Sequence, residues 1–347
     1  SFRARNWVTT PWNILAFTTR YTFSENTSLS LKAVYNHSGR NVIWRNEDGG
    51  PQALDIIDPT TGEYIPRELG KSVVNSITTE VRFLTNYSIL KTKQTLAAGV
   101  RVAYSKFHRQ GGGEGTTGFD YNFTLVSSQF EYDLIFTTLN VAPYFENTFR
   151  IGNNFSITPG VRFEYLNSKA SGYKIKDDVQ LNTDDSRNRY IPLAGIGLEY
   201  KVARTTNVYA NFSQAYKPFD YSDLTPFGVT SKIDPNMKDA YGWNADLGYR
   251  GTIKNILNFD LGGFCMQYNK RIGIVLKTDA VTGKQYTLRT NVANSLHVGV
   301  ESYIELNLMK WLAPHSKFGN ISIFNSFAYV HARYTTGDYK GNRVEYA

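Results

Sequence analysis

The sequence lacks any continuous apolar run that could cross a membrane as a helix. Its mean hydropathy is −0.37, and no stretch of about 18 consecutive apolar residues occurs in the chain. A transmembrane helix is therefore excluded. A transmembrane β-barrel is still allowed, because only every second residue of each barrel strand must face lipid.

Cysteine and the motifs of soluble enzymes are also scarce. The single cysteine, Cys265, excludes an intramolecular disulfide and a cysteine-based zinc site. The five histidines occur without a His-Glu-x-x-His or a Gly-x-Ser-x-Gly motif. The glycine run at 111–115 lacks the Gly-Lys-Ser/Thr ending of a phosphate loop, and we expect a flexible loop tip there. We predict no catalytic residues, no metal site, no cofactor and no enzyme, with a Ser–His pair on the wall as the remaining enzymatic alternative.

Charge of one sign is not concentrated anywhere along the chain. The formal net charge is +8, from 38 Lys and Arg against 30 Asp and Glu. Nucleic-acid-binding proteins gather such charge into a stripe or patch, whereas here the basic residues are scattered. The sequence therefore predicts no nucleic-acid partner.

Alternation of apolar and polar residues is the strongest positive signal. Between 298 and 308, Val298, Val300 and Ile304 alternate with Gly299, Glu301 and Glu305 on the opposite face. The pattern recurs in about twelve segments: 12–23, 27–36, 73–87, 93–108, 136–150, 153–168, 188–201, 205–216, 239–251, 255–269, 295–308 and 318–333. Soluble strands usually have about 5–6 residues, whereas a tilted membrane strand needs about 9–11. The segment lengths therefore favour a membrane barrel.

The connections between these segments alternate in length. Tight turns are predicted at 24–26, 151–152, 202–204 and 252–254, and long polar loops at 37–72, 109–135, 169–187, 217–238 and 270–294. Outer-membrane barrels have short periplasmic turns and long extracellular loops. We therefore predict an all-β fold, a transmembrane antiparallel up-and-down β-barrel. A soluble barrel or sandwich is the alternative.

Local turn and strand signals add smaller predictions. Two similar stretches, beginning at Asp58 and Asp279, each predict a hairpin closed by glycine. Pro143 and Pro192 fall on outward faces, where the missing amide hydrogen predicts a local bulge. Cys265 shares an apolar outward face and is predicted to be an inert filler.

The polar face of the predicted strands is unusually charged. A cation on the lipid side at mid-bilayer costs about 2–4 kcal/mol, so these residues should face the lumen. The candidates for contact with material inside the barrel are Arg82, Arg162, Glu164, Asp246, Arg250, Glu301 and Glu305. Charges of both signs on one strand favour a folded plug over a plain water-filled pore, which is the alternative.

Several motifs resemble those of TonB-dependent outer-membrane receptors. They are Asn211-Phe212-Ser213-Gln214-Ala215-Tyr216-Lys217-Pro218, Asp234-Pro235-Asn236-Met237-Lys238 and Trp243-Asn244 with Leu247-Gly248-Tyr249-Arg250. A later stretch, Thr290-Asn291-Val292-Ala293-Asn294, is also similar to the family. Among subfamilies, the residues 216–228 and 268–273 are most similar to ferric-citrate and siderophore receptors of the Bacteroidetes type.

The resemblance implies a 22-stranded barrel in the bacterial outer membrane with an N-terminal plug. About twelve strands are visible, so we interpret residues 1–347 as a partial barrel domain that lacks the plug, the early strands and the last strands. The implied function is import of a ferric chelate, with iron only as part of the cargo. The implied partners are the TonB complex, the chelate, lipopolysaccharide and outer-membrane lipid, with a surface lipoprotein as a further option.

Three residues near one predicted strand's outer end are candidates for chelate binding: Arg101, His108 and Arg109. Arginine suits bidentate binding of carboxylates, and cationic groups at a mouth attract an anionic chelate. Pairing of these charges with lipopolysaccharide phosphates or loop acids is the alternative. The rival functions are a passive porin or substrate-specific channel, a glycan or nutrient importer of the same barrel family, and an adhesin or secretion partner.

Overall fold

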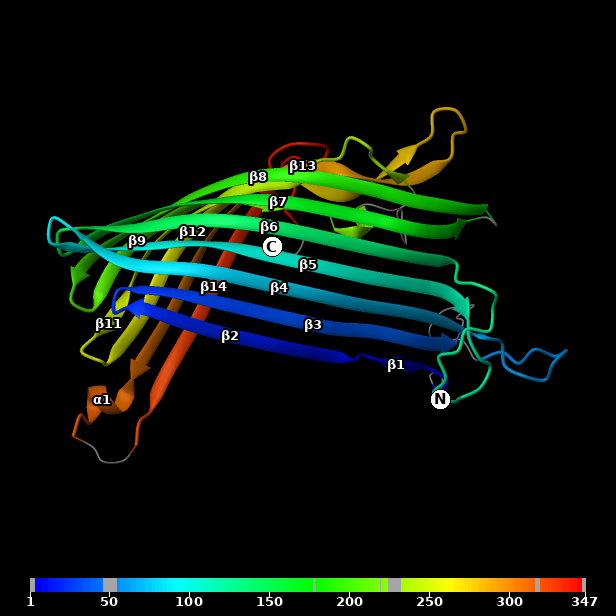
Figure 1. The fold of residues 1–347 in the computed structure, drawn as a ribbon, viewed down its shortest axis with the longest axis horizontal. Helices are drawn as coiled ribbons and strands as arrows, with labels where there is room; N and C mark the ends of the chain where they lie inside the picture. Colours follow the sequence, from blue (N-terminus) through cyan, green and yellow to red (C-terminus); the bar gives the residue numbers. More distant parts are fainter. Residues whose placement is uncertain are drawn as a thin grey trace.

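A single curved β-sheet makes up nearly all of the described structure (Figure 1). The structure is a computed structural model that describes residues 4–45, 55–176, 179–218, 220–223, 232–315 and 319–344. The sheet has fourteen strands in the order β1-β3-β4-β5-β6-β7-β8-β9-β11-β12-β13-β10, with β2 on β3 and β14 on β13. All neighbours are antiparallel except the short β10, which is parallel to β13.

The strands are long and follow one another along the chain. Their bounds are β1 Trp7–Thr9, β2 Trp12–Ser24, β3 Thr27–Arg45, β4 Arg67–Ile89, β5 Thr92–Glu114, β6 Tyr132–Ile151, β7 Phe155–Lys176, β8 Val179–Ala203, β9 Thr206–Lys217, β10 Lys232–Ile233, β11 Ala240–Ile253, β12 Leu257–Thr278, β13 Gln285–Asn307 and β14 Ser322–Tyr334. A 3₁₀ turn, η1 (Tyr221–Asp223), precedes β10, and a short helix, α1 (Leu308–Leu312), follows β13.

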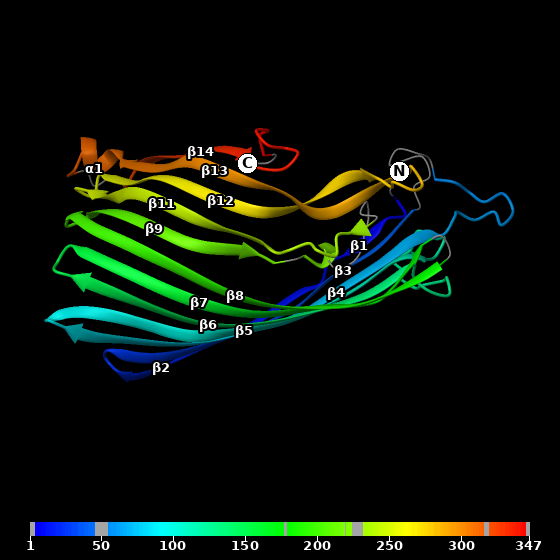
Figure 2. The same ribbon diagram turned by 90° about the horizontal axis from the view of Figure 1, so that it is seen from above.

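The sheet curves like part of a barrel wall (Figure 2). Consecutive long strands are hydrogen-bonded neighbours throughout, which is the up-and-down topology predicted from the alternation. The long strands β2–β9 and β11–β14 correspond to the twelve predicted segments. Over the described residues β2 and β14 do not pair with each other, so the sheet is an open part of a barrel.

The strands extend further than predicted at the end that carries the long connections. The predicted loop 37–72 is strand at both ends, because β3 continues to Arg45 and β4 begins at Arg67. The predicted loop 169–187 is almost all strand, with Ser171 paired to Asp184. Beyond the bilayer both faces of a strand meet water. The alternation of apolar and polar residues is then lost, although the hydrogen bonds between neighbouring strands continue. Polar sequence alone therefore does not distinguish these strand ends from loops.

The prediction of a flexible tip at 111–115 was wrong. Gly111, Gly112 and Gly113 belong to β5. A Cβ at Gly111 would meet the Tyr132 hydroxyl at 2.1 Å, and one at Gly113 would meet Leu125 at 2.4 Å. These glycines therefore let side chains pack directly on the strand backbone.

The bulges predicted at the two prolines are also absent. The pairings of β5 with β6 and of β7 with β8 run through Pro143 and Pro192 without a register shift. The reason is clear at Pro192, because β8 pairs with β9 only as far as Gly195. The Ala194 amide on that side already donates to a side chain, Gln214, at 2.9 Å. Two residues on, the proline faces an unpaired strand edge and removes no ladder bond.

The two predicted hairpins are confirmed. In each, an aspartate carbonyl accepts from a glycine in the left-handed region: Asp58 from Gly62 at 2.8 Å, and Asp279 from Gly283 at 2.9 Å. The glycine φ values are 72° and 68°. Both aspartates also accept backbone amides within their own turns, for example Thr60 to Asp58 at 2.7 Å.

Candidate functional site: the inner face and its outer end

One face of the sheet carries all the charged residues predicted to point inward. Strand register leads from Arg82 across Gly99 and Tyr144 to Arg162, so these positions share a face. Followed across the later strands, the same pairing places the other candidates there: Glu164, Asp246, Arg250, Glu301 and Glu305. A hollow of about 1110 Å³ is lined in part by Arg162 and Arg250. Contact of these residues with a plug stays a prediction.

Several of these charges have partners within the wall. Arg162 Nη2 lies 2.8 Å from Glu164 Oε1, and Arg250 Nη2 lies 3.5 Å from Glu199 Oε2. Such pairs fix the side chains in place, although the partly exposed Arg250–Glu199 pair contributes little to stability. The inner face therefore presents groups of both signs at defined positions.

A tyrosine ties three successive strands together on this face. Tyr144 of β6 lies across Gly99 of β5 and donates its hydroxyl to Glu80 of β4 at 2.9 Å. A Cβ at Gly99 would lie 2.7 Å from the Tyr144 ring. Glycine at this position therefore leaves the space through which the tyrosine reaches the carboxylate.

The same arrangement recurs further along the sheet. Tyr209 of β9 lies across Gly248 of β11 and donates to Asp260 of β12 at 3.0 Å. A Cβ at Gly248 would lie 2.4 Å from the Tyr209 ring. In both places an inward tyrosine therefore links three successive strands across a glycine of the middle strand.

A polar network closes the wall where β9 separates from β8. Glu164 is buried, with 5% of its surface exposed. It accepts from Asn140 Nδ2 at 2.9 Å and from the Tyr216 hydroxyl, and it pairs with Arg162. Nearby, Arg189 Nη1 lies 3.0 Å from Asp239 at the start of β11. These contacts join β9 to β7, and β8 to the residue before β11, beyond the point where the β8–β9 ladder ends.

The connection between β9 and β11 bridges distant parts of the wall. Its Tyr221 ring stacks on Phe136 of β6 and Phe107 of β5, with centroid separations of 4.7 and 5.6 Å. Its buried Asp223 forms an ion pair with Arg289 of β13. Since β6 and β13 are six steps apart in the sheet order, the connection spans the inner side at the outer end.

The connection is also fastened to β13 by two motifs that resemble the receptor family. Asp234 accepts the Thr290 hydroxyl at 2.6 Å and the Asn236 amide at 2.8 Å. These donors, Thr290 foremost, hold the pKa of Asp234 below its ordinary value. The Asn291 side chain accepts the Lys238 amide and donates to the Lys238 carbonyl, both at 2.8 Å.

The three chelate-binding candidates do not form one site. Arg101 and Arg109 share the inner face, and eight residues of β5 separate them by about 26 Å. Arg109 lies at the outer end, with its guanidinium 5.9 Å from the Tyr132 ring. His108 points to the opposite face and contacts Asp133 at 2.7 Å. Of the three, only Arg109 lies on the inner face at the outer end.

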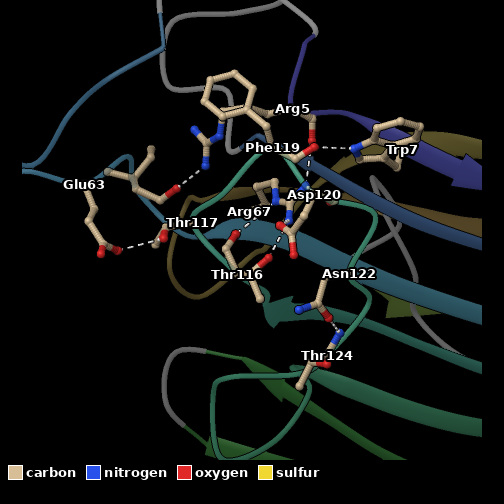
Figure 3. Close-up of polar contacts among 11 residues, drawn as sticks. Arg5, Trp7, Glu63, Arg67, Thr116, Thr117, Phe119, Asp120, Asn122 and Thr124 are labelled. Atoms are coloured by element: carbon tan, nitrogen blue, oxygen red, sulfur yellow. Dashed lines mark hydrogen bonds and ion pairs between the residues drawn. The ribbon is translucent and has the colours of Figure 1, made fainter.

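A buried arginine anchors the long connection between β5 and β6 (Figure 3). The Arg67 side chain is fully buried. It donates to the Asp120 carbonyl at 2.9 Å, to the Asp120 carboxylate at 3.0 Å and to the Thr116 carbonyl at 3.0 Å. The Trp7 indole adds a bond to the Phe119 carbonyl at 2.8 Å. No local pattern in the sequence predicts this anchor.

Within the described ranges there is no group of three or more His, Cys, Asp or Glu side chains that could hold a metal ion. In the same ranges, no helix is long and apolar enough to span a membrane.

The geometry is that of a barrel wall with a charged inner face and a structured outer mouth. The fold and this face define part of a transmembrane β-barrel.

The family model for "TonB dependent receptor-like, beta-barrel" matches residues 1–347, and the chain belongs to this family. Members are outer-membrane receptors and transporters rather than enzymes, so the chain is part of an outer-membrane protein.

Solved structures with this fold carry different cargoes. The chain resembles the unliganded ferric citrate transporter FecA, with 20% identity and a TM-score of 0.75, over 100% of this chain and 46% of FecA. It resembles the ferric yersiniabactin receptor FyuA from Yersinia pestis, with 14% identity and a TM-score of 0.68, over 98% of this chain and 46% of FyuA. The copper transporter OprC matches at 14% identity and a TM-score of 0.67, over 93% of this chain and 47% of OprC. The chain spans about half the length of these proteins, and at such identities the likeness concerns the fold alone.

Proposed function

We propose that the whole protein imports a ferric chelate, ferric citrate or another ferric siderophore, using energy delivered through TonB. The observation that carries this proposal is the inner face, where ion-paired groups of both signs stand at fixed positions. Such a face suits hydrogen bonding to a folded plug, whereas an open pore needs only hydrated charges. Family membership and the likeness to FecA and FyuA support the choice of cargo.

In this proposal the outer mouth makes the first contact with the chelate. Arg109 contributes a cation on the inner face beside the aromatic cluster of Phe107, Phe136 and Tyr221. A low-dielectric mouth focuses the field of such a cation and raises the local concentration of an anionic ligand. Iron enters only as part of the cargo.

The remaining partners follow from the same proposal. The plug would occupy the hollow lined by Arg162 and Arg250, and the plug would contact TonB in the periplasm. Lipopolysaccharide and phospholipid would cover the outward face. A surface lipoprotein is an additional partner if the cargo is a glycan.

The direct test is uptake of iron-labelled ferric citrate and siderophores by strains with and without the gene under iron limitation. We expect loss of uptake of at least one chelate in the deletion strain, restored by the intact gene and abolished without TonB. Equal uptake of every chelate in both strains would refute the proposal.

The rival functions give different outcomes in the same assay. A passive porin or substrate-specific channel would transport without TonB, and its coding sequence would lack a plug of about 120–200 residues upstream. A glycan or nutrient importer of this family would need TonB but would leave iron uptake unchanged. The same assay should also include labelled copper, because the copper transporter OprC shares the fold.

A further inference from the structure

The connection between β13 and β14 differs from every other described connection at the same end of the sheet. The others, at residues 25–26, 90–91, 152–154, 204–205 and 254–256, have two or three residues each. The β13–β14 connection runs from 308 to 321 and begins with α1, which lies at the short-turn end (Figure 1). Short turns mark the periplasmic end of an outer-membrane barrel. This connection is therefore an elaborated periplasmic turn.

The helix is preformed and exposes its largest apolar side chains. Asn307 caps it, accepting the Lys310 amide on its side-chain oxygen at 3.0 Å. No residue of the helix is buried. Trp311 is 58% exposed and Leu312 is 70% exposed. A capped helix keeps these two side chains presented without packing them against the wall.

The outward, lipid-facing side of the sheet leads directly into this turn. Leu306 pairs with Ile323 on the face that also carries Val300 and Tyr329. The ladder continues one step beyond the strands, where the Leu308 amide donates to the Ile321 carbonyl at 2.9 Å. The exposed apolar surface of the wall is thus continuous with the start of the helix.

We propose that this turn anchors the barrel in the periplasmic leaflet by inserting Trp311 and Leu312 among phospholipids. Tryptophan prefers the membrane–water interface, where its ring is apolar and its N–H stays hydrated. Lys310, exposed on the same helix, carries the charge that complements phospholipid phosphates, and its long stem can bring that charge to the headgroups. We infer a phospholipid surface as the partner, because the exposed side chains of Trp311 and Leu312 continue the outward face of β13 and β14, which faces lipid.

The test uses the whole protein reconstituted in phospholipid vesicles, with a nitroxide attached to Leu312→Cys in a Cys265→Ser background. Asn153→Cys, in the short turn between β6 and β7, is the matched control at the same end. We expect the label at 312 to collide several-fold more with oxygen than with a water-soluble nickel chelate. The label at 153 should show the reverse.

Either of two other results would refute the proposed lipid anchor. Nickel accessibility at 312 equal to that at 153 would place the turn in the aqueous periplasm. Shielding from both reagents would place it against protein, such as an adjoining strand or a plug. As an independent check, brominated phospholipids should quench wild-type tryptophan fluorescence more than that of Trp311→Phe. The test does not depend on the transported cargo.

Discussion

Thr290 donates its hydroxyl to the Asp234 carboxylate at 2.6 Å, across 56 residues of sequence. The two residues belong to separate motifs that resemble the receptor family, and the bond brings those motifs into contact. With the pairing of β10 to β13, it fixes the connection that spans the outer end of the inner face. The two motifs, which are far apart in the sequence, thus form one structural element.

Replacing Asp234 with Ala should loosen this connection. The carboxylate accepts two hydrogen bonds, and bonds to charged groups contribute about 1–2 kcal/mol each when partly exposed. We expect exchange of the amide at position 234, which donates to the Arg289 carbonyl at 2.9 Å, to accelerate at least tenfold. Asp234→Asn, which keeps an acceptor oxygen, should have a smaller effect. Asp58→Ala is the control, because it should open only its own hairpin.

Acid should release the same connection in the wild-type protein. The folded-state pKa of Asp234 is depressed from 3.8 by the Thr290 hydroxyl and the Asn236 amide. A depressed pKa contributes stability above the unfolded value, and the contribution is lost as pH falls through the folded value. Exchange protection of the Asp234 amide should therefore be constant from about pH 8 to pH 5 and fall below about pH 4. A fall already complete at pH 6 would contradict the assignment.

Adding one methyl group beneath Tyr209 should destabilise the wall. In Gly248→Ala the new Cβ would lie 2.4 Å from the ring, so the ring must move and its bond to Asp260 is lost. Overpacking of this kind costs about 1–3 kcal/mol. The measurement is chemical unfolding of the whole protein in vesicles.

Two variants separate this clash from a general intolerance of alanine. Gly160→Ala, on the same face, meets no atom closer than 3.7 Å and should be nearly neutral. Combining Gly248→Ala with Tyr209→Ala should cost less than the sum of the single changes, because the clash is gone. Strict additivity would refute the packing explanation.

Arg67→Lys should release the connection between β5 and β6 although it keeps the positive charge. Lysine cannot reproduce the forked donors that reach both Thr116 and Asp120. Loss of several bonds to a buried cation should lower local stability by about 3 kcal/mol. Protease cleavage within 115–131 on intact cells is the readout. Arg40→Lys is the control.

The sequence predicted the wall well, because a single rule governs the membrane-spanning part of each strand. The alternation predicts that Val298 and Glu301 face lipid and lumen respectively, and the strand register places them on opposite faces of the sheet. The rule fails outside the bilayer, where water meets both faces, and so the outer ends of β7 and β8 were interpreted as loop.

The outer mouth was not predictable for a different reason. Asp223 pairs with Arg289, and Arg67 binds Asp120, across long separations in the sequence. No periodicity encodes such contacts. The Asp-Pro-Asn-Met-Lys motif from Asp234 to Lys238 marked the element by resemblance, but its partner Thr290 emerged only from the structure.

The two faces of β5 supply the sharpest test of the proposed chelate site. Arg109 lies on the inner face at the outer end, whereas the adjacent His108 points outward and contacts Asp133. In the whole protein, Arg109→Ala should weaken ferric-chelate binding at least tenfold, since charge-assisted hydrogen bonds contribute about 1.5–3 kcal/mol. His108→Ala should leave affinity unchanged.

Arg101→Ala, about 26 Å deeper on the same strand, should leave binding of the chelate at the outer mouth unchanged and affect only transport. Isothermal titration with ferric citrate, at two salt concentrations, measures all three variants. Unchanged affinity in Arg109→Ala, or equal losses in Arg109→Ala and His108→Ala, would remove Arg109 from the site.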